Sequence, residues 1–350
     1  MSDIRETLKT AKGRGASDVV LVADAPAFMR VEGQWLAIGG EKLATHECEQ
    51  VVLSLVPEER RRTLYEEREL NFSASLVGLG RVRFNVHFQR DTLAATIRLI
   101  WPRVRTVEEL GLPGKLAEAA LRHQGLILIC GRAGAGKSTT LAALVQHILS
   151  ERRAHVITIE DPIEFVHENG IGICEQRELY TDTRGWEQAL KNVLRQSPDV
   201  IVIGELQNRE SIATAVTAAE TGHVVLASLH AQNAVQAVSR VVDVFPGDQQ
   251  TQIRLQLSNT LAAVLAQELV PTREQGRTLA TEFLLVNPAV RNLIRNGDYV
   301  QIHNCIVGSR SSGMHTMQDS LERLLSRGTI TQEEMLHRLN DSRRMCHAGA

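Results

Sequence analysis

The stretch LILICGRAGAGKSTTLAAL, residues 126–144, joins a short apolar run, a turn rich in glycine and the start of a helix-like pattern. Gly131, Gly136, Lys137 and Ser138 complete the pattern G-x-x-x-x-G-K-[ST]. Such a turn needs glycine because bare backbone N–H groups must approach phosphate oxygens beside the positive end of a helix. The pattern predicts a nucleotide site in which Lys137 neutralises β- and γ-phosphate charge and Ser138 binds Mg²⁺. The residues expected to contact the nucleotide are Gly131, Arg132, Ala133, Gly134, Ala135, Gly136, Lys137, Ser138 and Thr139.

Strand-like and helix-like runs alternate after this turn. The predicted strands are 126–130, 155–159, 199–204 and 223–229. A predicted helix follows the glycine turn and carries its apolar residues within 141–149, and further helices are predicted near 186–196 and 209–220. Nearly continuous apolar strands separated by helices indicate a parallel sheet covered on both faces. We therefore predict an α/β core over residues 116–287. Residues 288–350 are predicted to be mostly helical, with the last helices at 317–326 and 332–339.

The first hundred residues have a different pattern. Strand-like runs at 19–22, 82–88 and 93–100, together with a helix-like stretch at 46–55, predict a small α+β domain over residues 1–100. The segment WPRVRTVEELGLPGK, residues 101–115, contains prolines and glycines with little periodicity, as expected of a linker.

Composition makes some partners and locations less favoured. The chain has 39 Lys and Arg against 41 Asp and Glu, and its formal net charge of -2 does not favour nucleic acid as a partner. The start, MSDIRETLKTAKGRG, lacks the apolar segment of a signal peptide, and no apolar run is long enough to span a membrane. We expect a cytoplasmic protein that contacts a membrane only through a partner. Scattered cysteines also favour a reducing compartment, namely Cys48, Cys130, Cys174, Cys305 and Cys346.

Carboxylates at the ends of predicted strands are candidates for binding a metal or orienting water. EDPIEF follows the strand at 155–159 and offers Glu160, Asp161 and Glu164; a solvated acidic turn is the alternative. Glu205 directly follows the strand at 199–204, and capping of the next helix is its alternative role. The ends of parallel strands converge on one edge of the sheet, so these acids are expected near the phosphate site.

Histidines lie at both ends of the next predicted strand: His223 is its first residue, and His230 directly follows it. A histidine in such a place is more often structural than catalytic. A neutral imidazole at a strand end can nevertheless hydrogen-bond a carboxylate or a water beside a phosphate.

Several segments, in order and spacing, resemble the retraction ATPases of type IV pili, the PilT and PilU group of secretion ATPases. The resemblance extends almost end to end and includes ASDVVL (16–21) and RVRFNVHFQR (81–90) near the start and GMHTMQDSLERLLSRGTIT (313–331) near the end. The central segments are GRAGAGKSTTLAAL (131–144), ITIEDPIEFVH (157–167), LRQSPDVIVIGE (194–205), TAAETGHVVLASLH (217–230) and AVRNLIRNGD (289–298). The last is amphipathic, so a helix buried on one face is an alternative to a motor-specific role.

The resemblance implies a homo-hexameric ring in which ATP and Mg²⁺ bind between a small PAS-like domain and a RecA-like P-loop domain with C-terminal helices. It implies that Glu164 is the catalytic glutamate of the acidic box and that Glu205 is the Walker B glutamate. His223 and His230 match the histidine box. The arginines that match those supplied to the nucleotide site by the first domain are Arg81, Arg83 and Arg98. Their alternative is an ordinary solvated strand face.

The sequence departs from the family pattern at some positions. Leu206, Gln207 and Asn208 stand where the family usually has Met-Arg-Asp, and Arg132 and Ala133 replace the commoner Pro and Thr. None of these changes removes a residue needed for ATP or Mg²⁺. Loss of the Arg and Asp would weaken the coupling between the nucleotide and a neighbouring subunit.

The leading hypothesis is an ATP-driven motor that powers type IV pilus retraction through an inner-membrane platform protein. One alternative is a low-activity accessory subunit that joins a paralogous motor, which Gln207 and Asn208 would favour. Another is a pilus extension or type II secretion ATPase, although those relatives usually carry a four-cysteine zinc module and a further N-terminal domain. A RecA-like DNA or RNA motor is disfavoured by the near-neutral charge.

Overall fold

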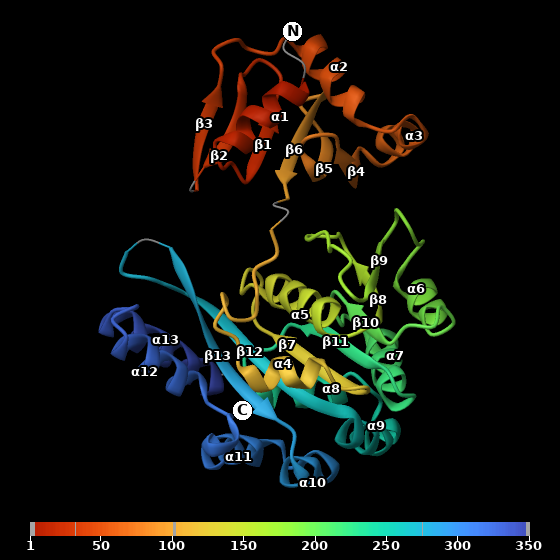
Figure 1. Ribbon diagram of the computed structural model, residues 1–350. Helices are drawn as coiled ribbons and strands as arrows, with labels where there is room; N and C mark the ends of the chain where they lie inside the picture. The colour runs from red at the N-terminus through yellow and green to blue at the C-terminus, as the bar shows by residue number, and fades with distance from the viewer. Residues whose placement is uncertain (1–3, 32, 101–102, 275, 348–350) are drawn as a thin grey trace. The chain divides into compact units, whose positions relative to one another are not determined.

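The computed structural model describes residues 4–31, 33–100, 103–274 and 276–347. The predicted first domain, linker and C-terminal region each include positions outside these ranges, namely 1–3, 32, 101–102 and 348–350. The chain divides into two compact units (Figure 1). The N-terminal unit is Met1–Arg103 together with Pro162–Val166, and the C-terminal unit is Val104–Asp161 together with His167–Ala350.

The N-terminal unit is an antiparallel sheet with helices packed against one face (Figure 1). Its helices are α1 (Ile4–Gly13), α2 (Thr45–Leu55) and α3 (Glu58–Glu67). Its strands, which lie in the order β3-β2-β1-β6-β5-β4, are β1 (Asp18–Leu21), β2 (Ala27–Val31), β3 (Gln34–Ile38), β4 (Glu69–Leu76), β5 (Gly80–Gln89) and β6 (Thr92–Leu99). The predicted α+β arrangement is confirmed. Strands β2, β3 and β4 were not predicted, and every residue of β3 is at least partly exposed, which removes the alternation that marks a strand.

The C-terminal unit is built on a second sheet in the order β13-β12-β7-β11-β10-β8-β9 (Figure 1). Its strands are β7 (Gly125–Cys130), β8 (His155–Glu160), β9 (Ile173–Glu178), β10 (Val200–Ile203), β11 (Val224–Leu229), β12 (Leu261–Pro271) and β13 (Arg277–Leu285). All neighbouring strands are parallel except β12 and β13, which form an antiparallel pair. The prediction of a parallel sheet is therefore correct for the strands identified in the sequence. It is wrong for β13, which is antiparallel to β12.

Helices cover both faces of this sheet, as predicted. The α-helices are α4 (Gly114–Ala120), α5 (Lys137–Glu151), α6 (Trp186–Val193), α7 (Arg209–Glu220), α8 (Ala234–Asp243), α9 (Gly247–Thr260), α10 (Pro288–Asn296), α11 (Ile302–Gly308), α12 (Met317–Ser326) and α13 (Gln332–His347). Short 3₁₀ turns lie at η1 (Tyr299–Gln301) and η2 (Arg310–Ser312). Helices α4 and α5 pack against one face, and helices α6 to α11 pack against the other.

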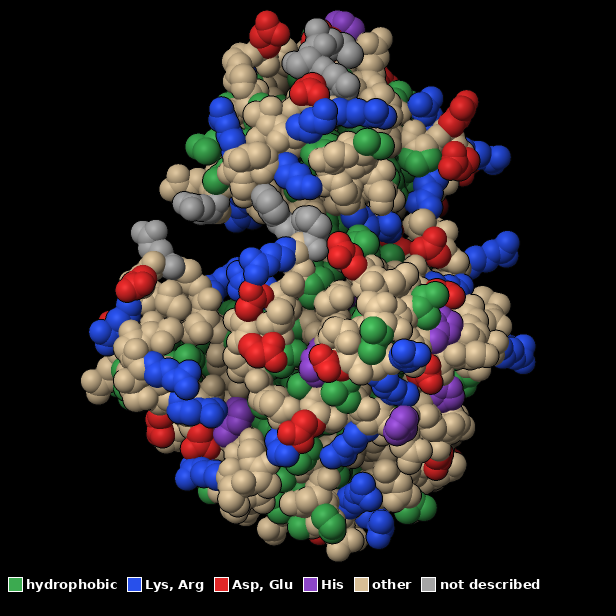
Figure 2. Space-filling model, viewed as in Figure 1, with side chains coloured by type: hydrophobic (Ala, Val, Ile, Leu, Met, Phe, Trp, Pro, Cys, Tyr) green, Lys and Arg blue, Asp and Glu red, His purple; other side chains and the backbone are tan. Residues whose placement is uncertain are grey.

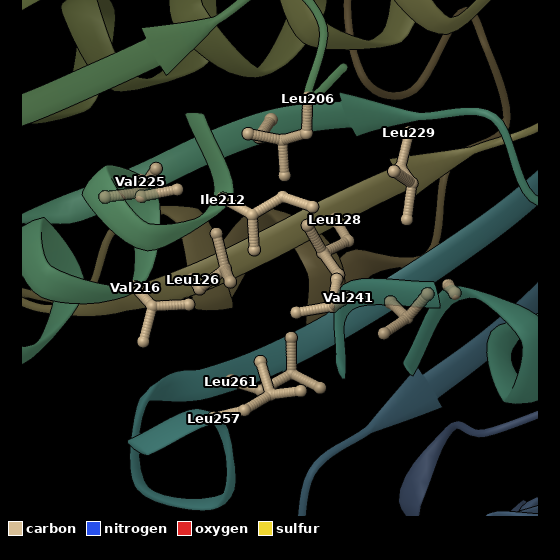
Figure 3. Close-up of a cluster of buried hydrophobic side chains, with 14 of the residues drawn as sticks. Leu126, Leu128, Leu206, Ile212, Val216, Val225, Leu229, Val241, Leu257 and Leu261 are labelled. Atoms are coloured by element: carbon tan, nitrogen blue, oxygen red, sulfur yellow. The ribbon is translucent and has the colours of Figure 1, made fainter. Parts of the chain in front are cut away.

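Alternation along β7 shows how one strand serves both layers. Leu126 and Leu128 point to the side of α7, α8 and α9 (Figure 3), whereas Ile127 and Ile129 belong to the cluster under α4 and α5. Because successive side chains on a strand point to opposite faces, a strand buried on both sides reads as a continuous apolar run. This explains why β7, β8, β10 and β11 could be predicted from the sequence.

Part of the segment predicted as a linker packs into the core of the C-terminal unit. Helix α4 begins at Gly114, and Val107 and Leu112 are buried in the same cluster as α4 and α5. Trp101 and Pro102, the first positions of the predicted linker, lie outside the described residues. Apolar residues without helical or strand periodicity can therefore be packing residues.

Helices α10 and α11 share the core on one face of the sheet, whereas α12 and α13 belong to a separate, smaller cluster. In α10, Val290 and Ile294 are fully buried in the cluster that covers one face of the sheet, whereas Arg291 and Arg295 are exposed. The buried-helix interpretation of this segment is therefore correct for its apolar face. Further along, α12 and α13 pack against the β12–β13 pair through a smaller cluster that includes Ile330.

His315 ties this C-terminal region to β13. Its Nε2 lies 2.8 Å from the Thr281 hydroxyl, and it is almost fully buried. Burial, with a smaller contribution from the charge of Arg323, lowers the pKa of His315 to about 4 from an ordinary value of 6.5. The folded state therefore keeps this imidazole neutral across a pH range in which the unfolded chain protonates it.

We predict that stability falls as the pH drops from 6.5 to about 4 and that His315 causes part of this fall. In that range the unfolded state binds more protons, so the free energy of unfolding decreases by up to about 1.4 kcal/mol per pH unit. His315→Gln should flatten this dependence relative to the wild type. Denaturant unfolding followed by tryptophan fluorescence at several pH values measures it. The exposed-site control His123→Gln should keep the wild-type slope, and identical slopes for His315→Gln and wild type would contradict the prediction.

Candidate active site

The phosphate loop leaves the end of β7 and enters α5. Gly131 has φ 155 and Gly136, the N-cap of α5, has φ 86, a left-handed conformation that glycine adopts without strain. A Cβ atom on Gly131 would lie 2.6 Å from the main-chain oxygen of Gln267, so no larger residue fits there. Gly136 also leaves the first amides of α5 without a side-chain cap. These amides form a ready site for an anion.

Lys137 folds over this loop. Its Nζ donates to the main-chain oxygens of Gly131, at 2.9 Å, and Arg132, at 3.1 Å. Ser138 and Thr139 follow in the first turn of α5 and are partly exposed. An ammonium group, hydroxyls and helix amides therefore converge where the sequence predicts phosphate binding.

Parallel strand pairing places Glu205, His230 and the phosphate loop together at the carboxyl ends of the strands. Strand β11 lies between β7 and β10, all three are parallel, and Leu229 pairs with Cys130 at the ends of β11 and β7. His230 follows β11 and Glu205 follows the end of β10. His230 Nε2 lies 2.8 Å from Glu205 Oε1, and Gln207 Nε2 donates to Glu205 Oε2 at 3.2 Å. The carboxylate of Glu205 is thus held by side chains on both of its oxygens.

Glu160 and Glu164, which the sequence predicts in one acidic segment, lie in different units. Glu160 is partly exposed, and its Oε1 accepts from Thr158 Oγ1 at 2.6 Å and from Gln176 Nε2 at 3.2 Å. Glu164 is exposed and belongs to Pro162–Val166, the segment grouped with the N-terminal unit. Within the C-terminal unit, therefore, the structure brings together the phosphate loop, Glu160, Glu205 and His230.

His223 and His230 lie at opposite ends of strand β11. His223 precedes β11, whereas His230 follows it, and a six-residue strand spans about 20 Å. His223 Nδ1 lies 3.0 Å from the main-chain oxygen of Ala218 and 3.2 Å from Thr221 Oγ1, at the end of α7. These contacts give His223 hydrogen-bond partners at the start of β11, one strand length away from His230, Glu205 and the phosphate loop.

The predicted arginines lie in the N-terminal unit on the sheet face opposite its helices. Arg83 pairs with Arg98 across β5 and β6, and Arg81 lies two residues away on the same face. Arg98 is also opposite Asp18 on β1, and its Nε lies 2.9 Å from Asp18 Oδ1. Ser73 of β4 is opposite Arg83. Sheet register thus gathers the arginines into one polar face.

The residues that depart from the family pattern after Glu205 have defined contacts. Asn208 is the N-cap of α7: its Oδ1 accepts from Ser211 N at 2.9 Å, and Ser211 Oγ accepts from Asn208 N. Asparagine and aspartate are about equally good N-caps. An Asp-to-Asn difference at this position therefore preserves the start of α7, and Gln207 supplies a neutral donor to Glu205.

Other features of the described residues set limits on the site. No helix in residues 4–31, 33–100, 103–274 and 276–347 is long and apolar enough to cross a membrane. Within the same ranges no group of three or more His, Cys, Asp and Glu side chains could enclose a metal ion. Figure 2 shows basic and acidic side chains interspersed on the visible face of the C-terminal unit.

Comparison with known proteins assigns the family. A model of the family described as "Type II/IV secretion system protein" matches residues 96–337. The chain belongs to this family. It is 39% identical to the type IV pilus ATPase PilU of Pseudomonas aeruginosa, over 99% of this chain and 92% of PilU. It is 38% identical to the type IV pilus retraction ATPase PilT of the same organism, over 95% of this chain and 96% of PilT.

A solved structure agrees with this assignment. The crystal structure of the pilus retraction motor PilT with bound ADP superposes with a TM-score of 0.91 at 38% identity, covering 96% of this chain and 97% of that one. This member of the type II/IV secretion family is therefore an ATPase with the α/β, RecA-like fold of its PilT relatives. The resemblance to the PilT and PilU group noted in the sequence is confirmed.

We predict that Lys137→Ala lowers ATP affinity roughly tenfold to a hundredfold, because a hydrogen bond to a charged phosphate contributes about 1.5–3 kcal/mol. Isothermal titration calorimetry with Mg-ATP measures the change. Lys191→Ala, at an exposed position on α6, is the matched control and should bind as the wild type does. Wild-type affinity in a folded Lys137→Ala variant would show that the loop lysine does not contact the nucleotide.

Proposed function

We propose that this chain is an ATP-hydrolysing motor that works as a homo-hexamer and powers type IV pilus retraction. It would act from the cytoplasm on an inner-membrane platform protein. The observation that carries the proposal is the nearly end-to-end similarity to PilT and PilU, combined with a complete phosphate loop and a paired Glu205 and His230.

The residues of the C-terminal unit suit ATP and Mg²⁺. The cradle between Gly131 and Gly136 is one that a Cβ atom would obstruct, and its amides and the Lys137 ammonium would hold the phosphates. The Ser138 hydroxyl and the Glu205 carboxylate, the latter through water, supply the hard oxygen ligands that Mg²⁺ prefers. When bound, Mg²⁺ would neutralise charge on the β- and γ-phosphates.

Hydrolysis requires an oriented water and stabilisation of charge on the transferred phosphoryl group. The water oxygen would bond to the γ-phosphorus as the bond from that phosphorus to the β–γ bridging oxygen breaks. We assign Glu164 and Glu205 to orienting this water. His230, 2.8 Å from Glu205, would fix the direction of the carboxylate. Arg81, Arg83 and Arg98 would stabilise phosphate charge across a subunit boundary, where a planar and permanently charged guanidinium is well suited.

Mechanical work follows if the units take different arrangements with ATP and with ADP, because a ligand shifts an equilibrium only by its differential affinity for the two states. Successive changes of arrangement in the subunits of the ring would then do mechanical work on the platform protein.

A second candidate is a low-activity accessory subunit of a paralogous motor. Gln207 and Asn208 favour it, because they replace charged residues of the family pattern with neutral ones. The contacts of these residues support the motor instead: the N-cap of α7 is kept and Glu205 keeps a donor. The turnover of the purified chain alone separates the two candidates.

We predict that the purified chain hydrolyses ATP by itself and that Glu205→Gln lowers kcat by about a hundredfold or more while ATP binding is retained, as expected for loss of a group that orients water. A steady-state phosphate-release assay measures kcat, and calorimetry measures binding. Glu210→Gln, an exposed acid in the first turn of α7, serves as the control. Negligible wild-type turnover, or equal turnover of wild type and Glu205→Gln, would favour the accessory role.

The cellular prediction concerns the direction of pilus movement. Deletion of the gene in its source organism should leave excess surface pili and abolish twitching movement, because assembly would continue without retraction. Electron microscopy of surface pili and a motility assay measure both effects. Loss of all pili would instead indicate an extension ATPase, and restoration by a Lys137→Ala chain would argue against any need for nucleotide.

A further inference from the structure

Gln267 of β12 lies directly beneath the phosphate loop, although it is 136 residues beyond the first glycine of that loop. Strand β12 pairs with β7 on one side and with β13 on the other, and Ala266 is opposite Cys130. The next residue along β12 is therefore beside Gly131. The Gln267 side chain is 3% exposed, and its backbone is part of a strand paired on both sides.

Gln267 contacts both ends of the glycine turn. Its Nε2 donates to the main-chain oxygen of Ala135 at 2.7 Å in a buried hydrogen bond. A Cβ atom on Gly136 would lie 3.3 Å from the same Nε2, and a Cβ atom on Gly131 would lie 2.6 Å from the Gln267 main-chain oxygen. One residue of a rigid strand thus supports the entry and the exit of the loop.

The chemistry of the contact defines the direction of one loop amide. A carbonyl oxygen only accepts, so the amide nitrogen of Gln267 must face Ala135. The C=O of Ala135 and the N–H of Gly136 belong to the same planar trans peptide and point in opposite directions. Holding the Ala135 oxygen toward β12 therefore directs the Gly136 N–H away from β12.

Packing alone does not explain a glutamine at this position. Among the described residues, Gln267 Oε1 is one of the buried polar atoms that lack a hydrogen-bond partner. A buried carbonyl without a partner lowers stability, and a methionine or leucine would fill the same space without that loss. The hydrogen bond from Nε2 to Ala135 is the contact that an apolar residue would not replace.

We propose that Gln267 is a positioning residue for nucleotide binding: it holds the Ala135–Gly136 peptide so that the Gly136 N–H donates to the β-phosphate. The inference rests on the proposed nucleotide site and adds to it a residue that contacts the loop rather than the nucleotide. A loop peptide that is free to rotate binds phosphate less tightly, because binding must then order it.

The test compares nucleotides that have and lack a β-phosphate. Gln267→Met keeps the volume of the side chain and removes the donor. Its affinity for ADP and ATP, measured by calorimetry on the full chain, should fall about tenfold, the value of one hydrogen bond to a charged group. Its affinity for AMP should stay within about twofold of wild type, because AMP has no β-phosphate. A residue that only maintained the fold would weaken all three nucleotides alike.

Leu269→Met is the matched control, since Leu269 lies on the same strand, near where a Cβ on Gly136 would be, and makes its contact by packing alone. It should bind all three nucleotides as the wild type does. If Gln267→Met fails to fold, Gln267→Asn tests the same point, because its amide is one methylene too short to reach Ala135; the same selective loss is expected. Wild-type affinities, or equal weakening for AMP, ADP and ATP, in a folded variant would overturn the inference. Failure of the wild type to bind ADP would instead contradict the nucleotide site itself.

Discussion

The hydrogen-bonded pairing of β7 with β11 on one side and β12 on the other is the constraint on which the site depends. Parallel register aligns the ends of these strands, so that Cys130 is opposite both Leu229 and Ala266. The phosphate loop that follows Cys130 therefore begins between His230 and Gln267. Neither neighbour is close to the loop in sequence. A slip of two residues in either pairing would move those side chains by about 7 Å and separate them from the loop.

The same strands keep this arrangement rigid because they are buried on both faces. Figure 3 shows Leu126, Leu128, Val225 and Leu229 packed against residues of α7, α8 and α9, and the alternate residues of β7 pack under α4 and α5. Full burial of one such aliphatic side chain contributes about 1.5–3 kcal/mol. The side chains of Glu205 and His230 lie just beyond the ends of β10 and β11, where they meet the loop. The buried faces of the strands thus contribute most to stability, whereas the residues just beyond their carboxyl ends form the candidate active site.

The edge is also where this chain differs from the usual pattern of its family. Gln207 and Asn208 replace charged residues, yet Asn208 caps α7 and Gln207 donates to Glu205. The changes therefore alter charge while keeping local geometry. This distinction matters for a motor, because binding and bond cleavage depend on the geometry at one site, whereas communication between subunits depends on charges that can reach a neighbour. The two functions can diverge within one fold.

The sequence by itself determined the phosphate loop, the strands β7, β8, β10 and β11 and the helices α5, α6 and α7, because these depend on local periodicity and on glycines with defined conformations. It also identified Glu205 and His230 as strand-end residues. It did not identify the β12–β13 pair, the contact between Gln267 and Ala135, or the hydrogen-bond partners of His223 at the end of α7. Strand order and register decide which distant residues meet. These are set by tertiary packing over the whole sheet and leave no local pattern in the chain.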